Sequence, residues 1–185
     1  MREKYQFIQD YTHYFLTFVI NHYIPVFNQD EACKIFLDNL EYYSQHQNLC
    51  VNAYVIMPEH IHLIAFDFHL DTNRLRKTIH NLRKYTGRTL LDYCQDCLPK
   101  DVYLKFQCKE CLDRKRQFWK SGIYPKAITG VEMWQQKMDY IHYNPVRRGL
   151  VPKTIDWKYS SAKYWDNMGV NRTQNFISPE YFNHQ

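Results

Sequence analysis

The alternation of hydrophobic and polar positions divides the chain into strand-like and helix-like segments. Alternating, β-branched and aromatic residues indicate strands, whereas apolar residues that recur every three or four positions indicate amphipathic helices. The predicted strands are residues 12–20, 49–57, 60–66 and 123–129. The predicted helices are residues 31–46, 72–92 and 131–143, begun by Asp30, by Asp71 or Thr72, and by Thr129 or Gly130. Asn144-Pro145 is expected to stop the third helix, and Ser160-Ser161 to cap a short one.

The order of these segments predicts an α+β fold. Pro58 lacks an amide proton and marks a turn, so the second and third strands read as a hairpin. The resulting β-α-β-β-α-β-α order is the ferredoxin-like (split βαβ) pattern, an antiparallel sheet with helices packed on one face. We expect a main domain from residues 1–92 and 117–150, a small insertion at 93–116, and a C-terminal tail at 151–185 that contacts a ligand or packs on the domain.

The composition restricts the possible classes of binding partner only slightly. The 185 residues suffice for one domain with a real core. A net charge of +5 permits a polyanionic partner without demanding one, and 16 Tyr, 11 Phe and 4 Trp suit stacked or half-wet surfaces. The polar start of the chain carries no signal pattern, and no apolar run approaches the ~20 residues of a membrane span. These features predict a cytoplasmic protein with no membrane contact.

Two C-x-x-C pairs, Cys94 with Cys97 and Cys108 with Cys111, form the most literal motif in the sequence. Four thiolates close a tetrahedral site around zinc, and such a closed site is structural. A redox pair and unconnected cysteines are the alternatives, but two such pairs this close favour a zinc-binding insertion. Cys33 and Cys50 lie far from the pairs and are expected to be core thiols.

His60 and His62 stand two residues apart in the third predicted strand. Side chains alternate along a strand, so both imidazoles point to the same face as Ile64. Two neighbouring imidazoles can hold one metal ion, but half-buried strand histidines with backbone partners would show the same spacing. The motif alone is consistent both with a metal site and with half-buried structural histidines.

The helix at 131–143 carries two polar residues that its packing does not explain. Val131, Trp134, Met138 and Ile141 make its apolar stripe. Tyr140 and Asn144 are one turn apart, off that stripe, and therefore lie on one face of their own. An exposed tyrosine in a Tyr-rich chain is the plain alternative.

Two stretches together resemble a known family. Met57-Pro-Glu-His-Ile-His-Leu-Ile64 with Met138-Asp-Tyr-Ile-His-Tyr-Asn-Pro-Val-Arg-Arg-Gly-Leu-Val151 is similar to the single-tyrosine (HUH) transposases of bacterial insertion sequences, in particular to the REP-associated tyrosine transposases. Further matches are residues 12–17, 118–119 and 157–161, so the resemblance spans roughly residues 10–165. The cysteine insertion is not part of the family core.

The resemblance implies a metal-dependent single-stranded DNA endonuclease and strand transferase that acts on hairpin DNA through a 5′-phosphotyrosine intermediate. Tyr140 would be the nucleophile, and His60, His62 and Asn144 would bind Mg²⁺ or Mn²⁺. The partner would be single-stranded or hairpin DNA, and the enzyme a monomer or a homodimer. His142 would face DNA without binding the metal.

Basic residues on the second helix and after the third are candidate phosphate contacts. These are Arg74, Arg76, Lys77, Arg83, Lys84, Arg147 and Arg148. A solvated helix face is the simpler explanation of such a run. Two other functions use the same residues: a non-catalytic, zinc-containing nucleic-acid-binding protein, and a metallo-hydrolase whose nucleophile is water.

Overall fold

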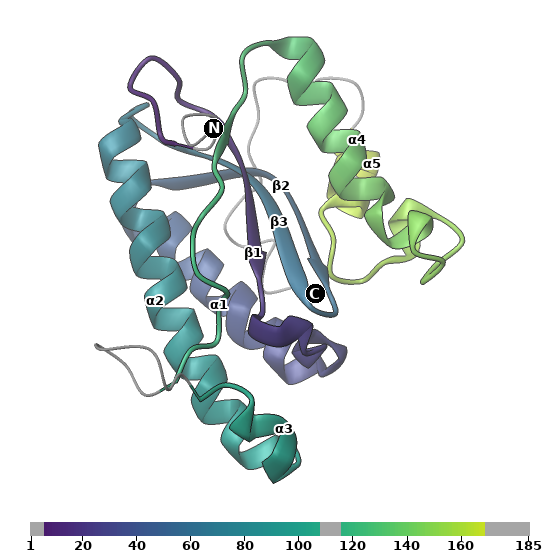
Figure 1. Ribbon diagram of the computed structural model, residues 1–185. Coiled ribbons are helices and arrows are strands. Elements are labelled where there is room, and N and C mark those ends of the chain that lie inside the picture. Colours follow the sequence, from purple (N-terminus) through teal and green to yellow (C-terminus); the bar gives the residue numbers. More distant parts are fainter. Residues whose placement is uncertain (1–5, 108–115, 169–185) are drawn as a thin grey trace.

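The computed structural model describes residues 6–107 and 116–168 (Figure 1). Its strands are β1 (Tyr14–Val19), β2 (Leu49–Met57), β3 (His60–Asp67) and β4 (Lys126–Ala127). Its α-helices are α1 (Asp30–His46), α2 (Thr72–Cys97), α3 (Lys100–Leu104), α4 (Val131–Arg147) and α5 (Ala162–Met168). No helix within these ranges is long and apolar enough to cross a bilayer.

The sheet has the order β2-β3-β1-β4, and each neighbouring pair is antiparallel. The predicted α+β fold with an antiparallel sheet is therefore confirmed. In the β1–β3 ladder, Thr17 lies opposite His62 and Val19 opposite His60. β4 has only two residues, much less than the predicted strand at 123–129, since Pro125 cannot donate to a ladder.

Helices cover both faces of the sheet, so the prediction that they lie on one face is wrong. α1 and α2 pack against each other and against β2 and β3, whereas α4 packs on the opposite face of the same strands (Figure 1). The strands explain this, because every residue of β2 is buried and β3 presents apolar side chains in both directions. A sheet that is apolar on both sides needs cover on both sides.

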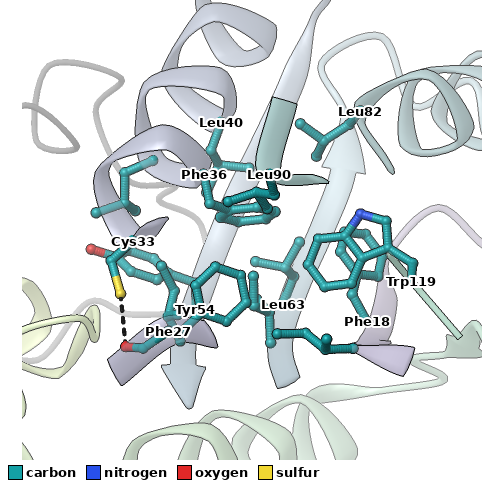
Figure 2. Packing of buried hydrophobic residues seen from close by; sticks show 14 of the residues in the cluster. Phe18, Phe27, Cys33, Phe36, Leu40, Tyr54, Leu63, Leu82, Leu90 and Trp119 are labelled. Atoms are coloured by element: carbon teal, nitrogen blue, oxygen red, sulfur yellow. Dashed lines mark hydrogen bonds between the residues drawn. The ribbon is translucent and has the colours of Figure 1, made fainter. Parts of the chain in front are cut away.

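The larger core lies between the sheet and the α1–α2 layer (Figure 2). Phe18 of β1, Phe36 of α1 and Trp119 meet there in edge-to-face contacts, with ring centroids 5.7–6.4 Å apart. Trp119 also lies against Gly87 of α2, where a Cβ atom would come within 2.9 Å of its ring. Cys33 is buried in this core and Cys50 is buried in β2, as expected for core thiols.

The first part of the C-terminal tail packs along the outer edge of β2. The indoles of Trp157 and Trp165 donate hydrogen bonds to the carbonyls of Ile56 (2.9 Å) and Asn52 (2.7 Å). Ser160 forms a bridge with β2, and α5 begins directly after Ser161, as predicted. These contacts cover an edge strand that would otherwise expose unpaired backbone groups.

Two predicted helix ends are wrong. α2 continues past residue 92 to Cys97, because its apolar face still has α1 and the core to pack on. α4 continues through Pro145 to Arg147. A proline in the last turn removes only one backbone hydrogen bond, and Pro145 is itself buried.

Candidate functional site

The structure brings Tyr140 of α4 to the two histidines of β3. The imidazoles of His60 and His62 have centroids 4.7 Å apart. The phenol ring of Tyr140 lies edge-on to His62 at 5.2 Å, Phe15 of β1 stacks on His62 at 5.1 Å, and the rings of Phe15 and Tyr140 are themselves 5.8 Å apart. Strand and helix are distant in sequence, yet one chain supplies all of these groups.

Both imidazoles are oriented through the same ring nitrogen. Nδ1 of His62 lies 2.9 Å from the hydroxyl of Thr17, its neighbour across the β1–β3 ladder. Nδ1 of His60 lies 3.0 Å from the carboxylate of Glu59, which also accepts a hydrogen bond from Arg148 at the end of α4. Engaging Nδ1 leaves Nε2 as the nitrogen that can bind a metal, as in known carboxylate–histidine–metal arrangements.

The histidines are in the right protonation state for metal ligation. Burial lowers the pKa of His62 to about 3, with smaller contributions in the same direction from His60 and Lys137. Burial also lowers the pKa of His60, against the opposing effect of Glu59. Neutral imidazole is the form that binds metals.

A divalent ion would need oxygen ligands as well. Among the described residues, no group of three or more His, Cys, Asp and Glu side chains is placed to hold a metal. Asn144, the predicted third ligand, is buried one turn beyond Tyr140. Two neutral imidazoles joined by an amide and by further oxygen ligands would suit Mn²⁺ and, less well, Mg²⁺, and the role of Asn144 as a ligand stays a prediction.

Two cations flank the Tyr140 ring. The guanidinium of Arg147 lies 5.2 Å from the ring centroid, and the ammonium of Lys137 lies 5.6 Å from it. Lys137 also lies 5.0 Å from the centroid of Phe15. Burial lowers the pKa of Lys137, and Lys126 lowers it further. Two positive charges therefore lie next to the Tyr140 ring, where they would attract an anionic ligand.

Packing and one polar contact hold α4 on the sheet. Trp134, Met138 and Ile141 pack against the same face that carries the histidines. Nε2 of His142 lies 2.9 Å from the hydroxyl of Ser161, which also bonds to the backbone of β2. His142 is buried, so the expectation that it faces DNA is wrong; it links α4 to the strand instead.

Most of the predicted basic residues of α2 line a groove apart from the histidines. The groove has a volume of about 1550 Å³ and lies between α2 and residues 116–125. Its basic lining comprises Arg76, Lys77, His80, Arg83, Lys84, Arg88, Arg116 and Lys120. None of His60, His62 and Tyr140 contributes to it. The structure thus separates a basic surface from the tyrosine–histidine cluster.

Two predicted phosphate contacts have acidic partners within the chain. Arg74 lies 3.3 Å from Asp67 and 3.5 Å from Asp71 at the start of α2, and it does not line the groove. Arg148 pairs with Glu59 beside His60. Both side chains therefore have a structural partner that the sequence alone did not reveal.

The described half of the cysteine motif lies at the end of α2. Cys94 is buried and Cys97 exposed, one helical turn apart. Burial, with a smaller effect from Cys97, raises the pKa of the Cys94 thiol to about 12. Cys108 and Cys111 lie outside the described residues, so the four-cysteine site stays a prediction.

Comparison with known proteins agrees with a site that contains a tyrosine. A Haemophilus influenzae protein named "Putative REP-associated tyrosine transposase" is 26% identical over 159 residues, 83% of this chain and 74% of the relative. The REP-associated tyrosine transposase of Escherichia coli is 25% identical over 111 residues, 60% of this chain and about half (53%) of the relative. This chain is a relative of the REP-associated tyrosine transposases.

The fold agrees with that relationship. A solved structure of a REP-associated tyrosine transposase bound to a REP hairpin superposes with a TM-score of 0.60, over 96% of this chain and 92% of the other. At 17% identity this likeness speaks for the fold alone. No protein-family model matches the chain.

Sequence reasoning missed Thr17, Glu59 and Lys137. Two of them could have been suspected from the sequence. Thr17 is two residues from Phe15 in the first strand and therefore shares its face, and Lys137 stands three residues before Tyr140 on the helix. Glu59 precedes the histidine pair but reads only as a turn residue. The roles of all three residues depend on contacts between segments that are distant in the sequence.

Proposed function

We propose that this protein is a metal-dependent single-stranded DNA endonuclease and strand transferase, a transposase that acts on hairpin DNA through a 5′-phosphotyrosine intermediate. The observation that carries the proposal is the packing of Tyr140 against His62, with His60 beside it. The ferredoxin-like assignment is part of this proposal, and it is supported by the β2-β3-β1-β4 order with α1 and α2 as the crossovers.

The proposed reaction is a transesterification at phosphorus. The phenol oxygen of Tyr140 forms a bond to phosphorus while the bond to the 3′ oxygen breaks, and the phenol proton ends on the released 3′-OH. One phosphodiester replaces another, so the reverse reaction can rejoin strands without ATP. Phe15 and Trp134 help to fix the α4–sheet contact that aims the phenol.

His60, His62 and Asn144 would hold the Mg²⁺ or Mn²⁺ ion. A bound ion would supply positive charge that polarises the phosphate. Thr17 and Glu59 keep the two imidazoles in place by engaging Nδ1. Arg147 would contact the DNA backbone next to the attacked phosphate, and its position over the Tyr140 ring supports this assignment.

The basic groove is the proposed binding surface for the DNA duplex or its single-stranded flank. Arg76, Lys77, Arg83 and Lys84 line it, which supports their assignment as phosphate contacts. A structural zinc ion held by Cys94, Cys97, Cys108 and Cys111 belongs to the same proposal. The turn spacing of Cys94 and Cys97 supports it, and zinc would deprotonate a thiol that burial otherwise keeps neutral.

A covalent adduct tests the proposal. Single-stranded hairpin DNA labelled at its 3′ end is incubated with the protein and Mn²⁺ and separated on a denaturing gel. We expect a labelled protein band that disappears in Tyr140→Phe and in His62→Ala. Tyr143→Phe is the matched control, because this tyrosine lies on the same helix with 54% of its surface exposed.

The separation of the basic groove from the histidines gives a second candidate, a nucleic-acid-binding protein without nuclease activity. It predicts tight hairpin binding, unchanged by Tyr140→Phe, and no adduct under any metal condition. A metallo-hydrolase predicts cleavage that survives Tyr140→Phe and leaves no protein on the DNA. Either result would refute the transesterase.

A further inference from the structure

Lys137 is a half-buried cation whose surroundings do not balance its charge. Its ammonium contacts the faces of Phe15 and Tyr140, at 5.0 and 5.6 Å from the ring centroids. No carboxylate within residues 6–107 and 116–168 pairs with it. Another cation, Lys126, acts on it and lowers its pKa further than burial alone does.

The fold accounts for this arrangement. Lys126 lies opposite Phe15 in the β1–β4 ladder, so both side chains share the face that α4 covers. Lys137 stands one turn before Tyr140 and is directed onto that face beside it. Cation–π contacts only partly replace the lost hydration of an ammonium. An anion delivered from outside the chain would complete the site.

We propose that Lys137 is a phosphate-binding residue, whose ammonium donates hydrogen bonds to a non-bridging oxygen of the phosphodiester that Tyr140 attacks. The identity of the anion rests on the proposed function. No proton is transferred by Lys137 in this role: it neutralises charge on the phosphate before and during the attack. Lys137 and His62, which both lie next to the Tyr140 ring, would thus approach the same phosphate.

The first test needs no catalysis. In a Tyr140→Phe background, the affinity for a single-stranded oligonucleotide is measured as a function of salt, with and without K137M. Methionine keeps the unbranched stem over Phe15 but removes the charge. Loss of one phosphate contact is expected to reduce the slope of log K against log salt by about 0.7. An unchanged slope would overturn the proposal.

The second test measures the rate of adduct formation at saturating hairpin DNA and Mn²⁺. We expect K137M to be slower by on the order of 100-fold, as for the loss of one charge-stabilising donor, and K137R to recover most of that rate. K163M, which removes an exposed lysine from α5, is the matched control and should match the wild type. A K137M rate within threefold of wild type, or a K137R rate as low as that of K137M, would overturn the assignment. Absence of any adduct in the wild type would refute the transesterase and leave the salt test to decide on Lys137.

Discussion

Replacing Thr17 by valine tests whether the β1–β3 pairing prepares His62 for a metal ion. The Thr17 hydroxyl lies 2.9 Å from Nδ1 of His62, and the two residues are direct partners in the ladder. Valine has nearly the same shape and keeps the backbone hydrogen bonds of β1. The substitution therefore removes the hydrogen bond that helps to fix the χ2 angle of the imidazole.

Partners that orient a metal-binding histidine typically contribute 10–100-fold to metal affinity, which corresponds to about 1.4–2.7 kcal/mol. We expect Thr17→Val to weaken Mn²⁺ binding by this factor. The free energy of unfolding should fall by only about 1 kcal/mol, the usual net value of one hydrogen bond, and the strand preference of valine offsets part of it. A large loss of affinity with a small loss of stability is thus the signature.

Electron paramagnetic resonance of free Mn²⁺ during a titration measures the affinity, and urea unfolding measures the stability. Thr17→Ser keeps the hydroxyl and should bind Mn²⁺ almost as tightly as the wild type. Thr89→Val is a control on α2, because it removes an exposed hydroxyl that donates to the Tyr85 carbonyl within the same helix. Mn²⁺ affinity in Thr17→Val within twofold of the wild type would show that the hydroxyl does not prepare a metal site.

Three further substitutions probe the rest of the molecule. Gly87→Ala places a Cβ atom 2.9 Å from the Trp119 ring, and the clash of about 1–3 kcal/mol exceeds the ~1 kcal/mol that alanine gains in a helix, so urea unfolding should show a net loss of about 1 kcal/mol. Glu59→Gln removes the carboxylate from Nδ1 of His60 and should weaken Mn²⁺ binding about tenfold in the same titration. The protein should contain about one zinc per chain by elemental analysis, lost in Cys94→Ser.

Each of these expectations has a clear contrary result. Stability of Gly87→Ala equal to or above that of the wild type would contradict the clash with Trp119. Unaltered Mn²⁺ affinity in Glu59→Gln would show that the Glu59 carboxylate pairs with Arg148 but does not prepare His60 for a metal ion. Wild-type protein without zinc would contradict the predicted four-cysteine zinc site.

The sequence by itself determined the local structure and the chemical groups of the site. Period-two and period-3.6 patterns depend on neighbours in the chain, so β1, α1, β2, β3 and α4 begin within one or two residues of where they were predicted. The same local rules placed His60 and His62 on one face of a strand and Tyr140 one turn from Asn144. Boundaries that depend on packing, such as the ends of α2 and α4, were missed.

Only the tertiary structure decided how these groups meet. The β1–β3 register pairs Thr17 with His62 across 45 residues, and the polar contact of His142 with Ser161 helps to hold α4 on the sheet. Because the strands are apolar on both sides, both faces of the sheet need cover. α4 packs on the face that carries the histidines, and α1 and α2 pack on the opposite face. Contacts between distant segments depend on how whole faces are buried, and a local pattern of residues does not contain that information.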